Sequence, residues 1–153
     1  MEKSDGRGVK ASSGSELCEI IKMKLMTIWG SYSDAVGIDE IVSRLKDGEH
    51  LKFVPHPYAD INKDEIVLVV ATGTLRNEHE DIEDAVHTKT KEVGLKHIGT
   101  GNQGGGRIKI EGNKLIFFDS SNKFGPYNKE LMQKVPGQVY LKTFEVESVE
   151  FRN

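Results

Sequence analysis

The histidines are the first residues whose chemistry stands out, because imidazole can accept a proton, take up a phosphoryl group or bind a metal near neutral pH. His79 lies in the first turn of a predicted helix, where unpaired backbone N–H groups attract anions and disfavour a protonated ring. Its acidic neighbours Glu78 and Glu80 act in the opposite direction, so the residues alone leave its pKa open. The remaining four are expected to be ordinary surface or core residues: His50, His56, His87 and His97.

No metal site is expected from these histidines. A zinc site on a helix would show a His-x-x-x-His or His-Glu-x-x-His spacing, and neither occurs in the chain.

A glycine-rich segment, residues 99–106, is the second candidate for chemistry. Gly99, Gly101 and Gly104 match the dinucleotide-binding spacing, but that motif needs a helix to begin at the glycines. The residues from Arg107 onward alternate as a strand does, which disfavours this reading, and no kinase motif follows. Two interpretations stay open. The glycine N–H groups cup an anion beside Arg107, or the glycines only permit tight turns.

A helix over residues 77–93 is expected to position the histidine of interest. Asn77 is the predicted cap, with Glu80 in the capping-box position, and Gly94 is placed to end the helix. Its predicted inner side consists of Ile82, Val86, Lys89 and Val93.

The other elements follow from apolar patterns and turn signals. Ile66–Val70 is a continuous apolar run, typical of a strand covered on both faces. After the helix we expect a strand over 95–98, a hairpin of 107–111 with 114–118, a polar loop over 119–123, a helix over 127–135 and a last strand within 139–151.

Two short helices are expected before this region. Apolar residues between Leu17 and Ile28 recur at helical spacing and predict a helix that starts at Glu16 and ends near Gly30; those between Ile38 and Leu45 predict another, which ends at Gly48. Pro55 and Pro57 mark the expected boundary. We therefore divide the chain into a disordered tail (1–15), a helical extension (16–50) and a main α/β domain (51–153).

Composition narrows the function classes. The chain has 153 residues, about one domain, and 21 Lys and Arg against 24 Asp and Glu give a net charge of −3. This balance disfavours nucleic acid as a partner. No apolar stretch suits a membrane span or a signal peptide, and one cysteine, Cys18, cannot form an internal disulfide. We expect a cytoplasmic protein that does not bind membranes.

Three segments together resemble the Janus family of small protein histidine phosphatases, the phosphohistidine phosphatases. They are Glu78–Val86, which contains the histidine; Gly104–Ile108, which reads Gly-Gly-Gly-Arg-Ile; and Leu115–Pro126, which ends in Phe-Gly-Pro. Their order and approximate spacing agree with the family across roughly residues 51–150.

The resemblance implies a mixed β-sheet flanked by helices and a metal-independent phosphatase, without cofactor, that acts on phosphohistidine in proteins or peptides. His79 is then the catalytic residue, either as the acceptor of the phosphoryl group or as a general base. The implied substrate-binding residues are Gly105, Gly106, Arg107, Ser121, Asn122 and Lys123. For Arg107, a structural ion pair is an equal alternative to a phosphate contact.

Two departures from the family suggest an alternative function. The family has a substrate-binding lysine on its first core strand, whereas our alignment puts Glu65 near that place, with Lys63 close by. The predicted N-terminal helix pair is also absent from the usual short chain of the family. A catalytically inactive phosphate- or phosphoprotein-binding module, whose helix pair docks a partner, is therefore the second hypothesis.

Overall fold

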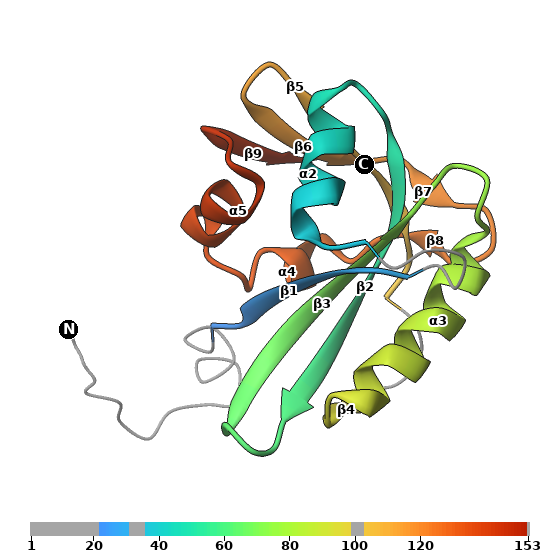
Figure 1. The fold of residues 1–153 in the computed structure, drawn as a ribbon, viewed down its shortest axis with the longest axis vertical. Helices are drawn as coiled ribbons and strands as arrows, with labels where there is room; N and C mark the ends of the chain where they lie inside the picture. The colour runs from blue at the N-terminus through green and yellow to red at the C-terminus, as the bar shows by residue number, and fades with distance from the viewer. Residues whose placement is uncertain (1–21, 31–35, 99–102, 153) are drawn as a thin grey trace.

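The computed structural model describes residues 22–30, 36–98 and 103–152, and its main element is a mixed β-sheet (Figure 1). Within these residues the sheet has seven strands in the order β1-β3-β2-β5-β6-β9, with β4 beside β2. Only β1–β3 and β6–β9 are parallel pairs. The strands are β1 (Lys24–Trp29), β2 (Leu51–Asp60), β3 (Glu65–Gly73), β4 (Leu95–His97), β5 (Gly106–Glu111), β6 (Lys114–Phe118) and β9 (Ser148–Phe151). The α/β class predicted from the sequence is confirmed.

Helices cover both faces of the sheet (Figure 1). One face packs against α3 (His79–Glu92), and the other packs against α2 (Ile38–Lys46), α4 (Lys129–Met132) and α5 (Gly137–Phe144). Strand β3 serves both cores: Leu68 and Val70 point to the three-helix side, and Val67 and Val69 point to α3. The prediction of a strand covered on both faces is confirmed. No helix in the described part of the chain is long and apolar enough to cross a membrane.

The predicted N-terminal helix is wrong for residues 24–29, which form β1. Its apolar residues Leu25 and Ile28 fit helical spacing, but the segment pairs along its whole length with β3, from Lys24↔Val67 to Trp29↔Thr72. Burial beside an apolar parallel strand overrides a short periodic pattern. The earlier part of that helix, with the predicted tail, lies outside the described residues.

Residues 24–46 also do not form a separate extension. The predicted second helix is confirmed as α2, but its residues Ile41 and Leu45 share one core with Trp29 and with Phe117 of β6. The predicted boundary at residue 50 therefore does not separate two packed units.

The two prolines that we took as that boundary lie inside β2. Strand β5 pairs with residues 51–53 and β4 pairs with residues 58–60, so the segment between them has a full partner strand, β3, on one side only. The carbonyl of Pro57 faces away from β3 and accepts a hydrogen bond from the N–H of Ile98 (3.2 Å). Pro55 has the same orientation, because it is two residues away. Neither missing N–H interrupts the β2–β3 pairing, which is where a strand tolerates proline.

Helix α3 is confirmed, but its start and one part of its inner side differ from the prediction. Glu78 is the N-cap and makes no side-chain capping bond. The side chain of Asn77 instead accepts a hydrogen bond from the N–H of Thr74 (2.9 Å). Val93, which we placed on the inner side, is 63% exposed, because the helix ends one residue earlier. Gly94 follows with φ 81°, as the predicted stop requires.

From β5 to the end of the described residues, the structure agrees less well with the elements predicted from the sequence. The β5–β6 hairpin is confirmed. The polar loop after it forms a small second sheet of β7 (Ser120–Ser121) and β8 (Gly125–Pro126). The helix predicted over 127–135 is only the short α4, and the sequence analysis missed α5, which begins after its N-cap, Pro136. Proline favours a helix start and disfavours continuation of the previous helix. The last strand is β9.

Gly104 gives a direct test of this packing. Its φ is +81°, and a Cβ built there would lie 1.9 Å from the carbonyl oxygen of Pro126. We expect Gly104→Ala to lower the free energy of unfolding by about 2–4 kcal/mol, because backbone must move and the left-handed conformation costs energy. Gly137→Ala is the matched control, since a Cβ there meets nothing within 4 Å. Urea denaturation measures both. Equal stability of the two variants would contradict the described packing.

Candidate functional site

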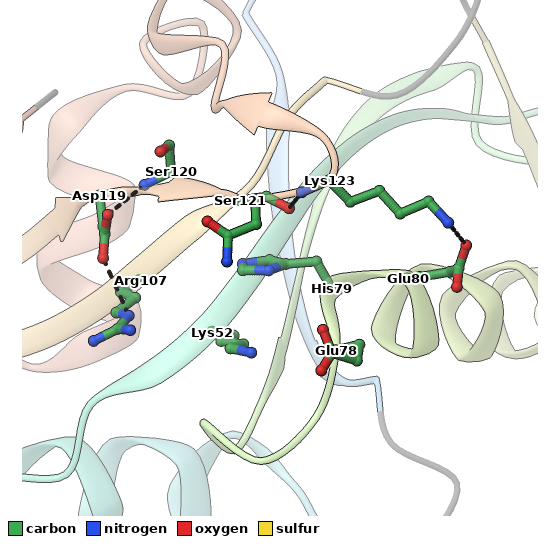
Figure 2. A pocket seen from close by; sticks show the side chains of 10 residues that line it. Lys52, Glu78, His79, Glu80, Arg107, Asp119, Ser120, Ser121 and Lys123 are labelled. Atoms are coloured by element: carbon green, nitrogen blue, oxygen red, sulfur yellow. Dashed lines mark hydrogen bonds and ion pairs between the residues drawn. The ribbon is translucent and has the colours of Figure 1, made fainter.

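A pocket of about 190 Å³ lies where the start of α3, strand β5 and the loop after β6 meet (Figure 2). Five of the residues proposed from the sequence line it together: His79, Arg107, Ser121, Asn122 and Lys123. The other residues that line it are Lys52, Glu78, Glu80, Asp119 and Ser120. The lining is therefore almost entirely polar, with cations and carboxylates interleaved.

His79 is fixed in the wall of this pocket by one buried hydrogen bond. The side chain is 7% exposed, and its Nε2 lies 2.9 Å from the carbonyl oxygen of Gly106. A carbonyl can only accept, so in the neutral ring Nε2 carries the proton and donates it. The lone pair is then on Nδ1. A histidine held in this tautomer has its basic nitrogen available for chemistry.

Gly105 makes room for that ring, and Gly106 makes room for the backbone of the next strand. A Cβ on Gly105 would come 2.7 Å from Cδ2 of His79, and a Cβ on Gly106 would come 2.6 Å from the carbonyl oxygen of Phe118. Both distances are shorter than real contacts allow. Neither glycine is among the residues that line the pocket, and their implied contact with a ligand stays a prediction. The rest of the glycine-rich segment, residues 99–102, lies outside the described residues, and β5 follows it with no helix start.

The surroundings favour the neutral form of His79. Burial lowers its pKa below the usual range, and the positive charges of Lys52 and Arg107 lower it further. The bond to Gly106 and the carboxylate of Glu78 act in the opposite direction, but burial has the largest effect. The acidic neighbours, which left the pKa of His79 open in the sequence, therefore have less effect on it than burial.

Lys52 is the pocket residue that the sequence analysis missed. The register pairs it with Gly73 on one side and with Arg107 on the other, so the two cations are cross-strand neighbours. Glu65 instead begins β3, at the opposite end from Gly73. Its carboxylate oxygen Oε2 forms an ion pair with Lys24 Nζ (2.6 Å). The lysine in this pocket therefore comes from β2. A strand assigned over Leu51–Asp60 would have revealed it, but the two prolines argued against one.

The three cations of the pocket are held differently. Arg107 Nε lies 3.2 Å from Asp119 Oδ2, and Lys123 Nζ is hydrogen-bonded to the carboxylate of Glu80. Lys52 Nζ donates to the carbonyl of Asn77 (2.7 Å) and has no carboxylate partner among the described residues. Arg107 thus makes the structural ion pair that we considered and also lines the pocket.

Backbone groups at two turns complete the site. The Oγ of buried Ser121 accepts hydrogen bonds from the N–H groups of Lys123 (3.3 Å) and Phe124 (3.0 Å), and so shapes the loop from within. The Lys123 amide is therefore already hydrogen-bonded within the loop. At the start of α3 the N-cap Glu78 offers no side-chain acceptor, and the N–H of Asp81 donates to the Glu78 carbonyl (3.0 Å). The amides of His79 and Glu80 therefore keep their capacity to bind an anion.

The protonation of His79 can be tested without any substrate. We expect its pKa to lie below 6.5 in an NMR titration of the ring carbon-bound protons. Lys52→Met removes a positive charge and should raise this pKa, whereas Glu78→Gln removes a negative charge and should lower it. Glu78 is exposed, so the second variant also controls for loss of packing. A pKa above 6.5, or shifts of the reverse sign, would show that the described electrostatics are wrong.

Comparison with known proteins gives no further assignment. No protein-family model matches the chain, and no curated protein sequence matches it significantly.

Proposed function

We propose that this protein is a metal-independent phosphohistidine phosphatase, which hydrolyses the P–N bond of phosphorylated histidine in proteins or peptides. The observation that carries the proposal is the buried bond from His79 Nε2 to Gly106, which leaves Nδ1 as the basic atom of a cationic, polar pocket. The resemblance of residues 78–86, 104–108 and 115–126 to that family supports the same activity.

A phosphoryl group suits the donors around this pocket. Lys52 supplies a positive charge without a carboxylate partner among the described residues, and the first two amides of α3, those of His79 and Glu80, supply N–H donors. Lys123 is exposed and bonded to Glu80, a pair that a phosphoryl oxygen can compete for. Phosphoryl transfer needs mainly positioning and charge stabilisation, which these groups provide without a metal.

His79 has two possible roles, and both use Nδ1. As a general base, Nδ1 takes a proton from water while the water oxygen bonds to phosphorus and the P–N bond breaks; the electron pair stays on the leaving nitrogen, which then takes up the proton from Nδ1. As a nucleophile, Nδ1 itself bonds to phosphorus while the P–N bond of the substrate breaks and the leaving nitrogen takes a proton from solvent; water then hydrolyses the phosphorylated His79. The products are free histidine in the substrate and inorganic phosphate in either case.

The alternative of an inactive binding module loses the two features that suggested it. Residues 24–29 form a strand of the central sheet, so the described residues before β2 contain one helix, α2, and not a pair. The pocket also contains a lysine, Lys52, although Glu65 lies elsewhere. The geometry therefore supports catalysis better than binding alone.

The central test is hydrolysis of a chemically phosphorylated histidine peptide by the parent protein and by His79→Gln, both in EDTA. Glutamine keeps an N–H donor for the Gly106 carbonyl but has no basic nitrogen. We expect activity in the parent and a loss of about 10²- to 10⁴-fold in the variant, the usual contribution of a proton-transfer group. His50→Gln is the matched control, because His50 lies outside the pocket.

Circular dichroism establishes that all three proteins are folded. If the folded parent protein releases no phosphate, or if His79→Gln is as active as His50→Gln, the proposed function is wrong. Samples quenched by denaturation at alkaline pH, where phosphohistidine survives, that contain phosphorylated His79 would assign the nucleophilic route.

A further inference from the structure

Three of the histidines that the sequence analysis treated as unrelated lie together where β2, α3 and β4 pack against one another. His56 is on β2, His87 is on α3 and His97 is on β4. Their ring centroids are 5.2 Å (His56–His87), 5.4 Å (His56–His97) and 5.6 Å (His87–His97) apart. None of the three lines the pocket that contains His79. In Figure 1, this is the region where α3 and β4 lie beside β2.

Two of the ring nitrogens already have the separation of ligands on one metal ion. His56 Nδ1 and His97 Nε2 are 3.4 Å apart. Two imidazole nitrogens on one tetrahedral zinc ion lie about 3.3 Å apart, because each Zn–N bond is about 2.0–2.1 Å. Ring centroids around a shared zinc are separated by about 5 Å for the same reason, close to the three observed values.

Two further ring nitrogens lie near groups that metal-bound histidines use as acceptors. His56 Nε2 lies 3.5 Å from Glu83 Oε2 without forming a hydrogen bond to it, and His87 Nδ1 lies 3.1 Å from the hydroxyl of Tyr58. A histidine that binds a metal through one nitrogen commonly donates the N–H of the other to a carboxylate or another acceptor. His56 Nε2 and Glu83 Oε2 are both buried, and neither has a hydrogen-bond partner among the described residues. A metal ion bound to His56 Nδ1 would favour a proton on Nε2, which could then donate a hydrogen bond to Glu83 Oε2.

We propose that His56, His87 and His97 form a binding site for a divalent transition metal, with Zn²⁺ as the type ion. In the structure, no three described His, Cys, Asp or Glu side chains yet converge as a metal site. His87 is exposed, so its ring can rotate and bring Nε2 to the point that His56 Nδ1 and His97 Nε2 share. Water supplies the fourth ligand. The ion would join β2, α3 and β4, and so hold the helix that carries His79.

The usual zinc spacing rule misses this site because each ligand comes from a different element. The proposal does not depend on the phosphatase, since the ion would lie outside its pocket.

Titration of the metal-free full-length chain with Zn²⁺, in competition with a chromophoric chelator, tests the proposal. We expect one Zn²⁺ per chain with micromolar or tighter affinity, and a higher Tm in its presence. Binding should weaken at least 30-fold in His97→Ala and in His87→Gln, the second of which changes only an exposed ring. His50→Gln and His79→Gln are the matched controls and should bind as the parent does. A Co²⁺-loaded sample should show the intense visible bands of a tetrahedral site.

The absence of stoichiometric binding to the folded parent would overturn the proposal. So would binding that survives both cluster variants, or binding that is lost in His79→Gln instead. Phosphatase activity in EDTA is a separate readout, so the failure of one proposal leaves the other standing.

Discussion

The hydrogen bond from His79 Nε2 to the Gly106 carbonyl is the contact on which the candidate site depends. It fixes the tautomer, and it requires a backbone without a side chain at Gly105, just before β5, so that the ring can lie against it. It also joins the start of α3 to a strand that is not its neighbour in sequence. The resemblance to phosphohistidine phosphatases includes these residues, and the structure gives a physical reason why a histidine and consecutive glycines occur together.

Charge around the pocket is nearly balanced, and this has a chemical use. Arg107 and Lys123 are each paired with a carboxylate, whereas Lys52 has no carboxylate partner among the described residues. A site with several unpaired cations would hold inorganic phosphate tightly, and product release would then suffer. Burial of His79 and the nearby Lys52 keep the ring neutral. The arrangement thus keeps His79 as a neutral base and leaves Lys52 to attract an anion, without a large excess of positive charge.

The sequence was sufficient where local pattern and tertiary environment agree. Helices α2 and α3, the apolar strand β3 and the β5–β6 hairpin all have local signals, and each was predicted. Strand β1 was not, because its pairing with β3 depends on residues more than 40 positions away. Lys52 was missed because Pro55 and Pro57 argued against a strand over residues 51–60. The strand tolerates these prolines because β4 and β5 pair with its two ends and leave the middle of β2 without a partner strand on that side. The histidine cluster has no local pattern, since three elements contribute one ring each.

The tautomer of His79 is the most direct test of this account. A long-range ¹H–¹⁵N correlation spectrum of the histidine-labelled protein at neutral pH distinguishes protonated from unprotonated ring nitrogens. We expect a neutral ring with the proton on Nε2 and a lone pair on Nδ1, and a change at Nδ1 when inorganic phosphate is added. A proton on Nδ1, or a doubly protonated ring, would contradict it, because the pocket would then contain no base.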